Sequence, residues 1–224
     1  MHHFITFATP EYFRFAHNIA QSALSKGEFD TARIFGPHDI PSEFFKANEN
    51  ILGQPRGAGY WLWKPYVVMR ALIEVPMGDT LCYCDSLYVF TGSIRTVTDD
   101  IFITCHKPNE STDGTIEHRL SKRDAIVLLD ADKPEITETT QAWGGFMVIR
   151  KTPETMMFIS KWFTYCQDAR IITDAPSVFG PEHPEFVDNR HDQTVLSLLA
   201  KKHGLKLHDF PPGLLFNLRS PLKE

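Results

Sequence analysis

The chain opens with a short apolar run, a periodic stretch and a second apolar run. Residues 4–8 have the composition of a buried strand, and Thr9 and Pro10 then suit the N-cap and first position of a helix. Apolar side chains recur at helical spacing before a stop at Gly27, namely Phe13, Ala16, Ala20 and Ala23. Residues 32–35 form the second strand-like run. This β-α-β order predicts a parallel sheet with a right-handed crossover.

The rest of the chain keeps alternating between short apolar runs and longer periodic stretches. It predicts strands at residues 80–84, 101–105, 145–150 and 205–208, and helices at residues 42–48, 64–75, 115–123, 153–167 and 192–202. Residues 54–59 resemble a flexible loop, and residues 168–190 form an irregular stretch long enough to be a lid or binding loop. We therefore expect an α/β fold in one Rossmann-like domain over residues 1–224, with a mostly parallel central sheet flanked by helices.

Composition excludes several classes of protein. With 42% apolar and 23% charged residues among 224, the chain is typical of a soluble globular protein. A net charge of −5 argues against broad nucleic-acid binding, because that requires a basic face. No run approaches the ~20 apolar residues that span a bilayer, and the N-terminus lacks a signal-peptide pattern. We expect a soluble cytoplasmic protein with no transmembrane segment and with reduced cysteines.

Asp85 is the first candidate for chemistry. It directly follows the strand predicted at residues 80–84, so its carboxylate is expected at the carboxyl edge of the sheet. Open α/β sheets bind ligands at that edge. A carboxylate there can hold Mg²⁺ or Mn²⁺ against diphosphate oxygens, or it can simply cap the following turn.

A glycine-rich, aromatic segment leads into the helix predicted at residues 64–75. Its glycines allow the backbone to approach a ligand closely, and flat faces for a base or sugar ring come from Tyr60, Trp61 and Trp63. Arg56 and Lys64 could meet phosphates. Aromatic rings before a helix also serve as ordinary core residues, so both interpretations stay open.

Two further segments combine polar or glycine residues with the start of a predicted element. His191 and Asp192 head the helix at residues 192–202, where Asp192 suits an N-cap and either residue could be a metal ligand or general base. Trp143, Gly144 and Gly145 precede or begin a strand, as a tight turn or as a surface against a sugar.

Several common motifs are absent from the sequence. It contains no phosphate loop of the Gly-x-x-x-x-Gly-Lys-Ser/Thr type, no Gly-x-Gly-x-x-Gly after the first strand and no Gly-x-Ser-x-Gly elbow. These absences count against an NTPase, a dinucleotide oxidoreductase and a typical α/β hydrolase.

Taken in order, four segments resemble the small GT-A-type glycosyltransferases marked by a Gly-Tyr-Trp-x-Trp-Lys-Pro motif, found in bacterial polysaccharide loci and some large viruses. The matching residues are 59–65 (Gly-Tyr-Trp-Leu-Trp-Lys-Pro), 78–85 (Gly-Asp-Thr-Leu-Cys-Tyr-Cys-Asp), 143–146 (Trp-Gly-Gly-Phe) and 191–197 (His-Asp-Gln-Thr-Val-Leu-Ser). The first motif is the most specific. The resemblance implies a GT-A fold with the nucleotide near Ala8 and Thr9, and a divalent metal, Mn²⁺ or Mg²⁺, near Asp85.

One departure from that family concerns the metal. Enzymes of the GT-A type usually carry Asp-x-Asp, whereas here Asp85 is followed by Ser86 and Leu87, and Leu87 cannot ligate. A second ligand could come from His191 or Asp192, or the metal could be weakly held or absent.

The resulting hypothesis is transfer of a hexose or deoxyhexose from a nucleotide-diphosphate sugar, UDP-sugar before GDP-sugar, to a sugar hydroxyl of an acceptor in glycan synthesis. Asp85 would hold the metal, His191 and Asp192 would be catalytic, and the donor would contact Ala8, Thr9, Arg56, Tyr60, Trp61, Lys64, Trp143, Gly144 and Gly145. The alternative is a non-catalytic nucleotide- or carbohydrate-binding module with a degenerate metal site. A nucleotidyltransferase ranks lower, because no glycine-rich basic loop follows the first strand.

Overall fold

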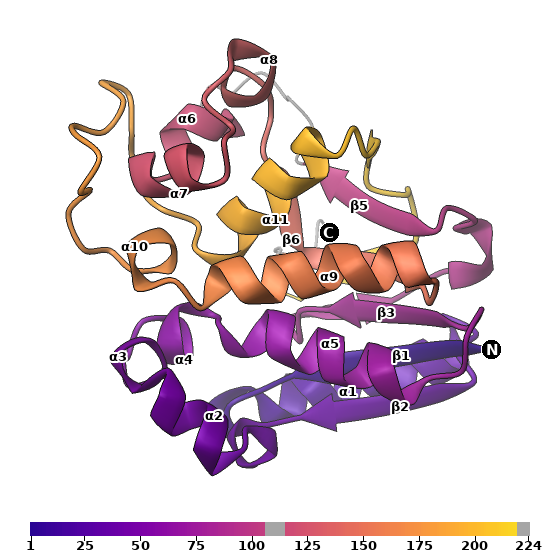
Figure 1. Ribbon diagram of the computed structural model, residues 1–224. Helices are drawn as coiled ribbons and strands as arrows, with labels where there is room; N and C mark the ends of the chain where they lie inside the picture. Colours follow the sequence, from indigo (N-terminus) through magenta and orange to yellow (C-terminus); the bar gives the residue numbers. More distant parts are fainter. Residues whose placement is uncertain (106–114, 219–224) are drawn as a thin grey trace.

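A central six-stranded sheet organises the computed structural model, which describes residues 1–105 and 115–218 (Figure 1). Its strand order is β2-β1-β3-β6-β5-β7, with bounds β1 His2–Phe7, β2 Thr31–Phe35, β3 Thr80–Cys84, β5 Ile101–Cys105, β6 Ala142–Arg150 and β7 Leu207–His208. The pairs β1–β2, β1–β3 and β5–β7 are parallel, whereas β6 runs antiparallel to both of its neighbours. The sheet is therefore mixed but mostly parallel.

Helices cover both faces of this sheet (Figure 1). The α-helices are α1 Phe13–Ser25, α2 Ser42–Ala47, α3 Glu49–Leu52, α4 Gly57–Tyr60, α5 Trp63–Glu74, α6 Glu117–Leu120, α7 Arg123–Leu128, α8 Pro134–Thr137, α9 Pro153–Cys166, α10 Ala169–Ile172 and α11 Asp192–Lys202. Short 3₁₀ turns in the described residues lie at Pro10–Tyr12, Pro37–Asp39 and Ile94–Thr96. The expected α/β fold with flanking helices is confirmed.

Alternation along the strands divides the core between the two faces. In β3, Leu81 and Tyr83 join the core under α5, α9 and α11, whereas Cys82 and Cys84 join the core on the other face with α1. Successive side chains of a strand point to opposite faces of the sheet. Because both faces are buried here, every position of β3 is apolar or buried, and the strand has a continuous apolar run. All four cysteines of the chain are free, as expected.

Several predicted elements differ from the structure. The helix predicted at residues 115–123 is split into α6 and α7, because Ser121 is extended and the buried Lys122 side chain turns inward to donate to the Arg170 carbonyl at 2.7 Å. The irregular stretch at residues 168–190 contains α10. The small antiparallel pair β4 Tyr88–Phe90 and β8 Leu215–Asn217 was not predicted; it anchors the C-terminal segment against α1.

Among the described residues, no helix combines the length and apolarity required to cross a membrane.

Candidate active site at the carboxyl edge of the sheet

The sequence candidates gather at one edge of the sheet because of strand direction. β1 and β3 are parallel, so Ala8 and Thr9 after β1 share an edge with Asp85 after β3. β6 is antiparallel to β3 and begins at this edge, where the Asp85 N–H donates to the Gly145 carbonyl at 2.9 Å. The N-termini of α5 and α11 reach the same edge through Lys64 and Asp192, which lie within ion-pair distance of each other.

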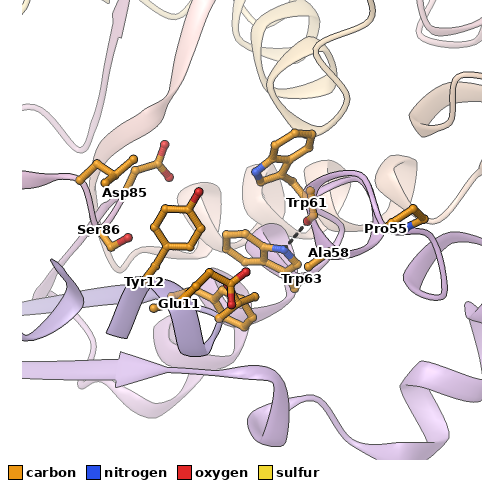
Figure 2. Close-up of a pocket in the computed structure, with 13 residues that line it drawn as sticks. Glu11, Tyr12, Pro55, Ala58, Trp61, Trp63, Asp85 and Ser86 are labelled. Carbon is orange, nitrogen blue, oxygen red and sulfur yellow. Dashed lines mark hydrogen bonds between the residues drawn. The ribbon is translucent and has the colours of Figure 1, made fainter. Parts of the chain in front are cut away.

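A cavity of about 470 Å³ opens at this edge (Figure 2). It is lined by Phe7, Ala8, Thr9, Glu11, Tyr12, Pro55, Gly57, Ala58, Trp61, Trp63, Asp85, Ser86 and Leu87. Figure 2 shows Asp85 and Ser86 on one side, Pro55 and Ala58 on the other, and the rings of Tyr12, Trp61 and Trp63 between them. A volume in the range of ~300–1,000 Å³ suits a small-molecule ligand.

Sequence reasoning identified only part of this lining. Of the predicted site residues, the cavity is lined by Ala8, Thr9, Trp61 and Asp85. It does not directly include Arg56, Tyr60, Lys64, Trp143, Gly144, Gly145, His191 or Asp192. Glu11 and Tyr12 were missed, although their position just after the first strand was an available signal.

The segment expected to be a flexible loop is instead a left-handed turn. Five consecutive residues have positive φ, with values of +60° at Gly57, +51° at Ala58, +97° at Gly59, +51° at Tyr60 and +58° at Trp61. For a residue with a Cβ this conformation costs roughly 1–2 kcal/mol. At Gly59 a Cβ would also lie 2.6 Å from the Cα of Leu52. Such strain persists only where the surroundings fix it, and here the Trp63 indole donates to the Gly57 carbonyl at 2.9 Å.

A buried lysine links two carboxylates behind the cavity. Lys64 Nζ lies 3.3 Å from Asp85 Oδ1 and 3.4 Å from Asp192 Oδ2, and it donates to the Gly144 carbonyl at 3.2 Å. The Lys64 side chain is only 5% exposed. Burial alone would lower the pKa of Lys64, but Asp192 and Asp85 raise it above its ordinary value. The Tyr83 hydroxyl also donates to Asp85 Oδ1 at 2.7 Å, so this carboxylate is held from two sides.

Asp192 is a buried carboxyl whose pKa is shifted by its surroundings. Burial raises the pKa of Asp192 from 3.8 to about 6, although the Lys64 ammonium opposes that shift. The side chain is 4% exposed, so it faces the interior rather than the cavity.

This shift predicts a specific pH dependence of stability. A carboxyl whose folded pKa exceeds its unfolded value binds protons more tightly in the native state, so its contribution is greatest below pH ~4 and is lost as pH rises through ~6. The lost contribution is about 3 kcal/mol. Asp192→Asn removes this titration. We expect the free energy of unfolding of the wild type, relative to Asp192→Asn, to fall between pH 4.5 and 7 in urea titrations. A constant difference across that range would contradict the assigned shift.

His191 connects the left-handed turn to α11. Its backbone has φ 55° and ψ −116°, and its ring stacks on Trp61 with centroids 5.2 Å apart. Nδ1 lies 2.8 Å from the Ile172 carbonyl, which can only accept, so Nδ1 carries the proton. Burial lowers the pKa of His191, and within residues 1–105 and 115–218 no group hydrogen-bonds to its buried Nε2. The neutral imidazole is therefore held behind the cavity by Ile172 and Trp61, with Nε2 as an acceptor atom.

Arg56 points away from the cavity. Its guanidinium pairs with Asp174 at 2.9 Å and with Asp188 at 2.6 Å, which ties the left-handed turn to the loop after α10. Because Arg56 is 41% exposed, each pair should contribute no more than ~1 kcal/mol. We expect Arg56→Gln to lower the free energy of unfolding by about 1 kcal/mol in urea titrations. A loss several times larger would show that the fold depends on this tie.

The Trp143–Gly145 segment lies inside β6 rather than in a turn before it. The Gly144 N–H donates to Gln193 Oε1 at 2.9 Å, which fixes β6 against α11. A Cβ at Gly145 would lie 2.3 Å from the Trp143 ring, so this glycine permits close ring packing. The segment supports the site through Gly144 and Lys64 instead of forming the cavity wall.

The donor set around Asp85 does not fit a divalent cation held by the protein. In residues 1–105 and 115–218, no three histidine, cysteine, aspartate or glutamate side chains converge as a ligand group. Leu87 occupies the cavity wall where a second acid would be expected. The Lys64 ammonium beside the same carboxylate would also repel a divalent cation. Neither His191 nor Asp192 supplies the second ligand, because Lys64 lies between Asp192 and Asp85, and His191 faces Ile172 and Asp174.

Comparison with known proteins adds little to this geometry. No protein-family model matches the chain, and no curated protein does. One solved structure that matches is mouse xyloside xylosyltransferase 1 in its apo form, with 11% sequence identity and a TM-score of 0.48. The match covers 93% of this chain and 84% of that one. A likeness this distant carries no argument about activity, so the functional case rests on the residues above.

Proposed function

We propose that this chain is a glycosyltransferase that takes a hexosyl or deoxyhexosyl group from a nucleotide-diphosphate sugar, with UDP-sugars favoured over GDP-sugars. The observation that carries the proposal is the cavity at the carboxyl edge of the sheet, where three aromatic rings face a carboxylate fixed from behind. The resemblance of residues 59–65 and 78–85 to GT-A-type enzymes supports it. The donor occupies this cavity and the acceptor is a sugar hydroxyl.

In this proposal the aromatic rings hold the nucleoside. Tyr12 and Trp61 offer flat faces against which a base or ribose can stack, whereas Trp63 is largely buried and stacks on Phe7 at the base of the cavity. Ala8 and Thr9 follow β1 without a bulky side chain and allow the nucleotide to approach the backbone. The two acids of the lining, Glu11 and Asp85, suit hydroxyl groups of ribose or sugar.

Asp85 is the carboxylate placed to face the reacting sugar. In the transfer, an acceptor oxygen bonds to the anomeric carbon, the bond from that carbon to the diphosphate oxygen breaks, and the hydroxyl proton passes to the Asp85 carboxylate, which lines the cavity. Lys64 and Asp192 act through Asp85, since both are buried behind it. Asp85 is 38% exposed and reaches the cavity.

A screen of nucleotides tests this function. UDP, GDP, CMP and dTDP are added to wild type, to Asp85→Ala and to Asp100→Ala, each with and without Mn²⁺, and thermal unfolding is followed. A ligand at 100 times its Kd stabilises the fold by about 2.7 kcal/mol. Asp100 is an exposed acid at the opposite edge of the sheet and serves as the matched control.

We expect one nucleotide to stabilise wild type and Asp100→Ala but not Asp85→Ala. The arms with and without Mn²⁺ are included because a divalent cofactor is a prediction from the resemblance alone. No response to any nucleotide would remove the donor site from this cavity.

A second candidate is a non-catalytic nucleotide- or carbohydrate-binding module. Leu87 in place of a second acid is the observation that favours it. Active transferases commonly hydrolyse their donor slowly when no acceptor is present, whereas a binding module does not. Release of UDP from UDP-sugars over a long incubation therefore separates the two candidates.

A further inference from the structure

A second cavity, of about 610 Å³, lies beside the first. It is bounded mainly by the loop after α10 and is lined by Arg56, Lys122, Thr173, Asp174, Ala175, Pro176, Ser177, Gly180, Pro181, Glu182, Phe186, Val187, Asp188 and Asn189. Its volume falls within the ~300–1,000 Å³ of small-molecule sites.

One short segment separates the two cavities. Pro55 and Gly57 line the first cavity, whereas Arg56 between them lines the second. The ion pairs from Arg56 to Asp174 and Asp188 hold the loop in place across the second cavity. A ligand in each cavity would therefore be separated by little more than one stretch of backbone.

The second cavity suits an uncharged, hydroxyl-rich ligand. Its lining includes the carboxylates of Asp174, Glu182 and Asp188 and the cations of Arg56 and Lys122. The formal charge of these five side chains is −1, which disfavours an anionic ligand. A hydroxyl group comes from Ser177, and apolar surface comes from Pro176, Pro181 and Phe186. The side chains of Thr173 and Asn189 are buried and already donate to the Ala169 and Ile171 carbonyls. Carboxylate and hydroxyl groups hydrogen-bond to sugar hydroxyls, while proline and aromatic faces suit C–H groups. This is the chemistry of a neutral sugar unit.

A buried polar atom connects this cavity to the candidate active site. His191 is 2% exposed, and its Nε2 has no hydrogen-bond partner in the part of the chain that the structure describes. That nitrogen faces the cavity-lining Asp174, with 3.7 Å between Nε2 and Oδ1. The same imidazole stacks on Trp61 of the first cavity and directly precedes Asp192. His191 does not itself line the second cavity, so it links the two cavities through Asp174 and Trp61 and does not contact a ligand directly.

We propose that the second cavity binds an uncharged sugar unit. This proposal does not rest on the transferase activity proposed above. The loop after α10 supplies most of the lining, so selectivity among sugars would be determined by residues 173–189.

Saturation-transfer NMR with simple sugars tests this inference. The methyl glycosides of glucose, galactose, mannose and rhamnose are the probes, with glucose 1-phosphate as an anionic comparison, in the absence and presence of UDP. The blocking variant is Ala175→Trp, which places an indole at the cavity wall. Val178→Trp is the matched control, because Val178 lies on the same loop, is 66% exposed and does not line the cavity. Asp174→Asn tests the polar contact without adding bulk.

We expect at least one methyl glycoside to bind wild type and Val178→Trp. In Ala175→Trp its affinity should fall about tenfold or more, a change of about 1.4 kcal/mol in binding free energy. Asp174→Asn should weaken it in the same direction, and glucose 1-phosphate should bind less well than the neutral probes. Absence of any glycoside signal, or a signal that Ala175→Trp leaves unchanged, would overturn the assignment.

The resonances of UDP in the same samples separate this inference from the proposed function. If a glycoside binds and UDP does not, the second cavity remains a sugar site and the proposed transferase activity fails. If UDP binds and no glycoside does, the donor site stands and the inference about the second cavity fails.

Discussion

Replacement of Lys64 by methionine is expected to destabilise the protein by about 3–5 kcal/mol. The Lys64 ammonium is within 3.4 Å of two carboxylates, and Asp192 is buried with it. Removal of one partner from a buried ion pair leaves an uncompensated charge, which costs far more than the pair itself contributes. For a chain of this length, 1 kcal/mol corresponds to ~2–4 °C, so Tm should fall by roughly 6–20 °C. Thermal unfolding at pH 7.5 measures this directly.

A double variant and a pH series show whether the lost charge is the cause. Asp192→Asn in the Lys64→Met background removes the uncompensated carboxylate and should restore a large part of the stability. The destabilisation by Lys64→Met should also be smaller at pH 5 than at pH 7.5, because a carboxyl without its cation is protonated more readily. If the double variant is as unstable as Lys64→Met alone, lost packing of the lysine side chain is the better explanation.

Replacement of Asp85 by asparagine is expected to lower the rate of sugar transfer by roughly 10²–10⁴-fold, the usual effect of removing a group that assists proton transfer. Asparagine keeps the shape and can still accept the hydrogen bond from Tyr83, which now reaches Asp85 at 2.7 Å. The charge that faces the cavity is lost. Release of UDP from the donor that the nucleotide screen identifies measures the rate.

The free energy of unfolding of Asp85→Asn shows whether the lower rate comes from lost chemistry or from a damaged fold. Asp85 is 38% exposed, so Asp85→Asn should cost about 1–2 kcal/mol, less than Lys64→Met. Asp100→Asn, at the other edge of the sheet, should leave the rate unchanged. Full activity of folded Asp85→Asn would exclude Asp85 from the reaction.

The sequence predicted the elements whose patterns are local. The strands Thr80–Cys84 and Ile101–Cys105 and the helix Asp192–Lys202 have the bounds that hydrophobic periodicity indicated. The position of Asp85 at the carboxyl edge followed from the strand before it and from the parallel order of the first strands. Aromatic rings near a ligand site were also expected, and Trp61 lines the cavity.

Other features depend on contacts between distant residues. The antiparallel direction of β6 does not appear in its apolar run, because a buried strand has the same pattern in either direction. The inward turn of Lys122 was not predicted either, since a basic residue near a helix end is usually solvated. The left-handed turn at Gly57–Trp61 contains three residues that disfavour positive φ, so local propensity argued against it.

The sequence by itself determined the α/β layering, the edge of the sheet where the candidate site lies, and the residue types available there. Only the tertiary structure decided that Lys64, Asp85 and Asp192 converge, that Arg56 turns to a second cavity, and that Glu11 and Tyr12 complete the first. The physical reason is the separation along the sequence of the residues that make contact. Periodicity and capping report on neighbours within one or two turns, whereas a site of this kind is made by side chains up to 128 positions apart that only packing of the sheet and helices brings within 3.4 Å of one cation.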